Sequence, residues 1–173
     1  NQINMSQKGI ALVLQELEEA DILRSEKRGN MLLYSLHLSN PIIKDILTIT
    51  ETMKKLQFLK KNLKIQHIFQ DNYQLIGIFG SYAKGKHKKD SDIDVFAIGK
   101  EPMIKKYDMD VHVQVFKEKE FVHMLQEKIP LAQEIVSNHI ILSHPEQFTW
   151  MIWEEYYGLH KMVFGSEKRH FIS

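Results

Sequence analysis

The chain has 173 residues, enough for one ordinary domain or for a small domain joined to a further module. Its 43% hydrophobic and 26% charged residues are typical of a soluble globular protein, and the net charge of +1 indicates no partner by itself. The absence of cysteine excludes disulfides and thiolate metal sites. No apolar run approaches the roughly 20 residues that cross a bilayer, so we expect a cytoplasmic protein with no membrane partner.

Residues 1–40 are expected to form a small module. Ser6 is a good helix N-cap, and apolar residues follow it at helical spacing, which predicts a helix over 7–20 with one buried face. Gly29-Asn30 separates two strand-like segments and predicts a β-hairpin whose turn residues have positive φ. Because the chain starts Asn-Gln-Ile-Asn-Met and enters a helix almost at once, we expect further residues upstream of Asn1.

A helix followed by a hairpin with a basic tip resembles the second half of a winged helix-turn-helix domain, although no diagnostic motif accompanies the pattern. The resemblance implies DNA binding through basic side chains on the helix and the hairpin, namely Lys8, Arg24, Lys27 and Arg28. The same segment has four basic and five acidic side chains, so it brings little net positive charge to phosphates. DNA binding and a protein-contact role, including homodimer formation, therefore both stay open.

A connecting helix is predicted within residues 41–72. Asn40-Pro41 is a typical helix start, and apolar residues recur at roughly helical spacing from Ile42 to about Gln66. Six lysines against two acids lie between them, which fits a solvated face better than a face along nucleic acid. After a break at Asp71-Asn72, we expect a domain with C-terminal helices over 73–165 and a tail over 166–173.

The stretch from Leu75 to Ile98 carries the clearest chemistry. An apolar run, read as a buried strand, ends at Gly80-Ser81, where a small residue allows close approach of a ligand and a hydroxyl can donate to a phosphate oxygen. A basic loop follows, and Asp92 and Asp94 then share one face of the next predicted strand. Two carboxylates on one face can hold a hard cation such as Mg²⁺.

This arrangement resembles the signature of the DNA polymerase beta-like nucleotidyltransferase superfamily: an apolar residue, Gly-Gly/Ser, a short spacer, then Asp-apolar-Asp/Glu-apolar. Here Phe79-Gly80-Ser81 precedes Asp92-Ile93-Asp94-Val95 by ten residues, and the string GSYAKG…SDIDV looks like the minimal nucleotidyltransferase branch. The resemblance implies an α+β fold with a small mixed sheet flanked by helices, here preceded by a partial winged helix.

The resemblance also implies a Mg²⁺-dependent transfer from a nucleoside triphosphate, with ATP as the expected nucleotide. Asp92 and Asp94 would hold the metal ion, and Gly80 and Ser81 would contact the β- and γ-phosphates. Basic loop residues would neutralise the triphosphate: Lys84, Lys86, Lys88 and Lys89. Relatives with the minimal domain often act as antitoxins that adenylylate a partner toxin, so a partner protein is the first acceptor considered, before an RNA end or a small molecule.

A third carboxylate usually stands on the neighbouring strand of this family, here predicted over residues 110–116. Asp110, His112 and Gln114 point to one side of that strand, and the family's position falls nearest His112. Asp110 lies one pleat earlier, so it could be the third catalytic and metal-binding carboxylate only if the strand register allows. The alternative function is therefore a non-catalytic, nucleotide-sensing DNA-binding regulator with a degenerate transferase site.

The C-terminal third is predicted to be mainly helical. Helices are expected over about 118–128 and 130–138, then from Glu146 to near Gly158, with 139–142 as a short apolar link. We assign the aromatic residues of the last helix to the core or to a dimer contact rather than to base stacking. The nine histidines lack zinc-site spacing, so no zinc site is predicted.

Overall fold

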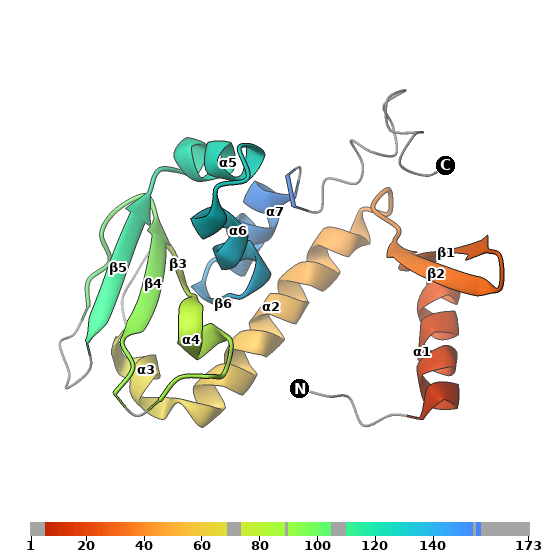
Figure 1. Cartoon of the computed structure of the whole chain (residues 1–173), viewed down its shortest axis with the longest axis horizontal. Coiled ribbons are helices and arrows are strands. Elements are labelled where there is room, and N and C mark those ends of the chain that lie inside the picture. The colour runs from red at the N-terminus through yellow and green to blue at the C-terminus, as the bar shows by residue number, and fades with distance from the viewer. Residues whose placement is uncertain (1–5, 69–73, 89, 105–109, 154, 157–173) are drawn as a thin grey trace. The chain divides into compact units, whose positions relative to one another are not determined.

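The computed structural model describes residues 6–68, 74–88, 90–104, 110–153 and 155–156 (Figure 1). The chain divides into two compact units, Asn1–Asp45 and Ile46–Ser173, and each is described by itself. The division falls inside the connecting helix, a few residues after the boundary expected at 40/41. Among the predicted features, the break at Asp71-Asn72, the helix end near Gly158 and the tail lie outside the described residues.

The first unit contains the predicted helix and hairpin. Helix α1 (Gln7–Glu19) begins after Ser6, whose Oγ accepts a hydrogen bond from the Gly9 backbone N–H at 3.1 Å. Strands β1 (Leu23–Arg28) and β2 (Met31–Leu36) pair antiparallel across a two-residue turn. These elements confirm the local predictions, whereas the winged-helix interpretation stays a prediction.

Two details of this unit differ from expectation. Only Gly29 of the turn pair has positive φ (+61°), which suits a hairpin turn with glycine at its first central position rather than one that needs two such residues. Helix α1 has no buried residue, so the predicted buried face is wrong for this unit. A two-stranded hairpin is too small a partner to enclose a helix face.

The connecting segment forms two helices instead of one. Helix α2 (Ile42–Lys61) begins where the Asn40 side chain accepts a hydrogen bond from the Ile42 backbone N–H. It ends before Asn62, whose side-chain amide donates to the Phe58 carbonyl at 2.9 Å, and α3 (Leu63–Ile68) follows. Asparagine interrupts helices in this way because its side chain competes for backbone hydrogen bonds.

The second unit is built on a four-stranded sheet in the order β5-β4-β3-β6. Strand β4 (Ile93–Ile98) pairs parallel with β5 (Val111–Phe116), and β3 (Leu75–Ile78) pairs antiparallel with both β4 and β6 (Ile140–Ser143). The mixed sheet confirms the predicted α+β class. Strand β6 corrects the sequence interpretation, which took this segment for a link because a four-residue apolar run has no readable period.

Four helices complete this unit: α4 (Gly80–Ala83), α5 (Glu118–Gln126), α6 (Pro130–Ser137) and α7 (Pro145–Ile152). Helices α5 and α6 lie close to their predicted ranges. Helix α7 ends at Ile152. Within the described part of the chain, no helix is both long enough and apolar enough to cross a membrane.

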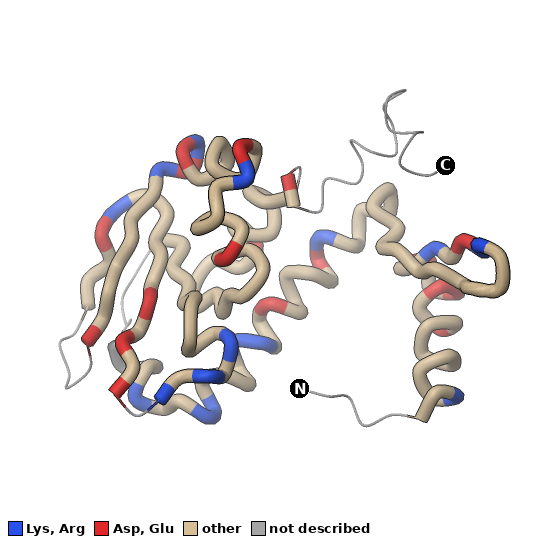
Figure 2. The backbone as a smooth tube through the Cα atoms, viewed as in Figure 1, with Lys and Arg blue, Asp and Glu red and all other residues tan. Residues whose placement is uncertain are grey.

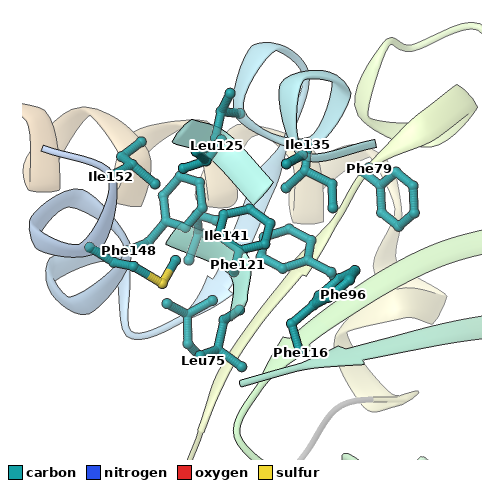
Figure 3. Packing of buried hydrophobic residues seen from close by; sticks show 14 residues of the cluster. Leu75, Phe79, Phe96, Phe116, Phe121, Leu125, Ile135, Ile141, Phe148 and Ile152 are labelled. Carbon is teal, nitrogen blue, oxygen red and sulfur yellow. The ribbon is translucent and has the colours of Figure 1, made fainter. Parts of the chain in front are cut away.

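Each face of the sheet has its own apolar cluster, although most of the edge strand β5 is exposed or only partly buried. On one face, the Phe96 ring lies 5.9–6.3 Å from the rings of Phe79, Phe121 and Phe148, and α5, α6 and α7 supply the surrounding side chains (Figure 3). On the other face, alternate strand residues pack against Phe58, Ile65 and Tyr82. Phe148 is thus a core residue as predicted, although Trp150 on the same helix is 62% exposed.

A buried ionic cluster joins α2 to the segment after α6. Glu51 Oε2 lies 3.1 Å from His139 Nε2 and 2.9 Å from Lys54 Nζ, and both Glu51 and His139 are buried. His139 Nδ1 faces the carbonyl oxygens of Ile135 and Val136, and its Nε2 lies near Lys54 Nζ as well as Glu51. Burial raises the pKa of Glu51, but His139 and then Lys54 outweigh it and leave that pKa below its usual value.

Candidate functional site

The turn after β3 brings backbone and carboxylate into close contact. Gly80 is buried with φ +67°, and the preceding Phe79 N–H donates to the Asp94 carbonyl at 2.9 Å. A Cβ on Gly80 would collide with Asp94 Oδ2. Two reasons therefore favour glycine here: the backbone is left-handed, and the Asp94 carboxylate occupies the place of a Cβ. Ser81 follows Gly80 in the first turn of α4.

Gly80→Ala is expected to destabilise the protein by about 1–3 kcal/mol, through the strained backbone and the displacement of Asp94. Denaturant unfolding checks this value. Gly85→Ala is a matched control, since it also has positive φ (+65°) but a Cβ there would meet open space. A Gly80 variant no less stable than the Gly85 variant would contradict the close contact.

Asp92 and Asp94 lie at the start of β4, on the same face of the strand as the buried Phe96. Asp92 is exposed just before the strand, and Asp94 is half-buried inside it. Burial raises the pKa of Asp94; His112 and Lys84 oppose that shift, whereas Asp92 and Glu134 add to it. The two predicted carboxylates are thus brought together in surroundings that disfavour charge on Asp94 unless a cation is near.

The parallel pairing of β4 with β5 decides which residue stands beside them. His112 is the register partner of Asp94, and its Nδ1 lies 3.8 Å from Asp92 Oδ2. Asp110 precedes β5, exposes its side chain and accepts the Ile93 N–H through its backbone carbonyl. The described residues contain no group of three His, Asp or Glu side chains placed to hold a metal ion, so Asp110 as third ligand stays a prediction.

A hard divalent cation suits this donor set with the help of substrate. Mg²⁺ is commonly held by one or two carboxylates together with substrate phosphates and water. Asp92 and Asp94 supply two such carboxylates, and the absence of a Cβ on Gly80 lets the Asp94 carboxylate lie directly against the backbone of the turn. The residues therefore fit a magnesium-nucleotide complex better than a free ion.

The predicted phosphate-binding lysines fall into different environments. Lys84 Nζ forms an ion pair with Glu134 Oε1 at 2.6 Å, so this lysine already has a partner on α6. Lys86 is exposed in the loop, and Lys89 lies outside the described residues. Glu134 was not predicted from the sequence. It lies on α6, fifty residues after Lys84 in the chain, and no local motif indicates that the two residues meet.

The four residues predicted to bind DNA all lie in the first unit, with exposed side chains. Lys8 is near the start of α1, and Arg24, Lys27 and Arg28 lie on β1, the last two beside the hairpin turn. Arg28 also pairs with Glu26 at 3.1 Å, which lowers the charge available at the tip. Their role in DNA binding stays a prediction.

Comparison with known proteins adds a family to this geometry. No curated protein and no solved structure matches the chain. Residues 63–147, from α3 into α7, match the family described as Polymerase beta, Nucleotidyltransferase. The matched range contains the Gly80 turn, the paired aspartates and the whole four-stranded sheet. Residues 63–147, just under half of the chain, are therefore similar to a polymerase beta-type nucleotidyltransferase domain.

Proposed function

We propose that the second unit transfers a nucleoside monophosphate from a nucleoside triphosphate, with ATP as first candidate, to a hydroxyl group. The single observation that carries this proposal is the contact between the Gly80 turn and Asp94 of β4, because it sets a positive-φ glycine turn at the start of a helix directly against one of the two paired carboxylates. A hydroxyl of a partner protein remains the first acceptor to examine, ahead of an RNA end or a small molecule.

Each residue of the candidate site has its own role in the proposed reaction. Asp92 and Asp94 would hold Mg²⁺, which when bound neutralises and orients the phosphates for in-line attack. The backbone at Gly80 and the Ser81 hydroxyl would contact the terminal phosphates. A bond forms between the acceptor oxygen and the α-phosphorus, the bond from that phosphorus to the β-bridging oxygen breaks, and pyrophosphate leaves. His112, beside the aspartates, can take the proton that the hydroxyl loses.

Two labelling patterns of ATP test the proposal. The protein is incubated with Mg²⁺, candidate acceptors and ATP labelled either at the α- or at the γ-phosphate, with EDTA in a parallel reaction. Nucleotidyl transfer is expected to label the acceptor from α-labelled ATP only, and EDTA should abolish the label. Label from the γ-position would instead indicate a kinase, and Mg-dependent ATP binding without any transfer would favour the second candidate below.

The second candidate is a nucleotide-sensing DNA-binding regulator without transferase activity. The observation that favours it is His112, a poor magnesium ligand, in register with Asp94 where the family's third carboxylate is expected. Under this function, magnesium-ATP changes the affinity of the protein for DNA without any transfer. Electrophoretic mobility shifts over a salt series test it, and no DNA binding at low salt would exclude it.

His112→Asp is expected to raise Mn²⁺ or Mg²⁺ affinity by about tenfold or more, since a third carboxylate beside the pair need add only ~1.4 kcal/mol of binding free energy. Calorimetry or Mn²⁺ relaxation measures this without relying on catalysis. His123→Asp, at an exposed position of α5, is the matched control and should leave metal binding unchanged. Equal effects of the two substitutions would contradict the assignment of the β5 position.

A further inference from the structure

A basic cavity lies on the opposite face of the sheet from the aspartates. Its volume is about 570 Å³, and it is formed where α2 ends, where α3 begins and where the loop after α4 returns toward β4. Tyr82 and Ile65, which line it, pack with Ile93 and Val95, whereas Asp94 and Phe96 point to the other side of β4. The cavity is therefore separate from the candidate transferase site.

Lysine side chains dominate the charge of this cavity. Its lining contains one acid, Asp90, against four lysines: Lys60, Lys61, Lys64 and Lys88. None of these four has an ion-pair partner among the described residues, in contrast to Lys54 and Lys84, which pair with acids. Figure 2 shows basic positions gathered along the end of α2 and the loop after α4. Four unpaired ammonium groups around one cavity repel each other unless an anion lies between them.

A histidine adds a polar group that is short of a partner. The His87 ring lines the cavity and stacks on Tyr82 with centroids 4.0 Å apart and an interplanar angle of 5°. Its Nδ1 is enclosed and has no hydrogen-bond partner among the described residues. An enclosed ring nitrogen without a partner is unfavourable, and a ligand oxygen would relieve it.

We propose that this cavity binds phosphate esters, with the four lysines holding at least two phosphate groups and His87 donating a further hydrogen bond. Lysine ammonium groups bind phosphate as point charges, and the volume lies in the range of small-ligand sites. The phosphates belong either to a nucleoside polyphosphate or to a strand of nucleic acid. The proposal is independent of transferase activity, since it concerns the other face of the sheet.

Fluorescence anisotropy in EDTA tests the site, because removing divalent metal suppresses nucleotide binding at Asp92 and Asp94. The full chain is titrated against a labelled single-stranded RNA dodecamer and, in a second arm, a labelled nucleoside triphosphate. The pocket variant is Lys60→Glu/Lys64→Glu, and the charge-matched control is Lys100→Glu/Lys119→Glu, at exposed positions away from the cavity. Thermal unfolding verifies that both variants are folded.

Loss of two phosphate contacts is expected to weaken binding at least tenfold and to reduce the slope of log K against log salt by about 1.4 for a single strand. The control variant should change affinity less than twofold. Pocket-dependent binding of the dodecamer alone identifies a nucleic-acid strand as the source of the phosphates, and equal binding of the nucleotide identifies a small ligand. Absence of binding to both probes at low salt, or equal weakening by the control, would overturn the proposal.

Discussion

Glu51→Ala should destabilise the second unit by about 3–5 kcal/mol at neutral pH, because it removes the buried carboxylate that both His139 and Lys54 contact. The measurement is urea unfolding at constant ionic strength. Glu101→Ala, an exposed glutamate of the same unit, is the matched control and should stay within about 0.5 kcal/mol of the parent. A loss for Glu51→Ala no greater than for the control would contradict the buried cluster.

The pH dependence of this effect has a definite sign. The pKa of Glu51 is lower in the folded protein than its usual value near 4.5, so the ionised carboxylate stabilises the fold. That contribution is fully present above the usual value and is lost as pH falls through the lowered folded-state pKa. The difference between parent and Glu51→Ala should therefore shrink in acid below pH 4.5.

The parts of the fold that sequence predicts are those set by neighbours in the chain. The Ser6 cap, the Gly29 turn and the strand–turn–strand around Gly80 are each determined within a few residues, and all three are present. The helix break at Asn62 is also set by a local contact, but the sequence does not predict it. A single asparagine among periodic apolar residues and lysines gives only a weak signal for a helix end.

Contacts between segments far apart in the chain could not be predicted from the sequence, because they depend on how the elements pack. Strand β6 forms because β3 offers it an open edge, and Ile140 pairs with Ile78 although the two are 62 residues apart in the chain. Glu134 likewise reaches Lys84 only through the packing of α6. The choice between Asp110 and His112 needed the β4–β5 register, since a shift by two residues would exchange their positions on the same face.

Asp94→Asn is expected to lower nucleotidyl transfer by roughly 10²–10³-fold, since the loss of one metal-binding carboxylate removes several kcal/mol of charge stabilisation. The measurement is the initial rate with α-labelled ATP at saturating Mg²⁺. Asp110→Asn, exposed and outside the register position of the pair, is the matched control and should retain most of the activity. Equal losses in both variants would instead place Asp110 in the site.

The same substitution should stabilise the metal-free protein at neutral pH. Burial raises the pKa of Asp94, so the folded state favours the protonated carboxyl, and that stability is lost as pH rises through the folded-state pKa. Asparagine stays neutral and avoids this loss, so the melting temperature of Asp94→Asn should exceed that of the parent at pH 7 and approach it in acid. Magnesium-ATP should then raise the melting temperature of the parent but not of the variant. If Asp94 lowers the stability of the metal-free protein and raises that of the magnesium-ATP complex, its carboxylate is positioned for binding. A variant less stable than the parent in EDTA would instead show that Asp94 has a structural role.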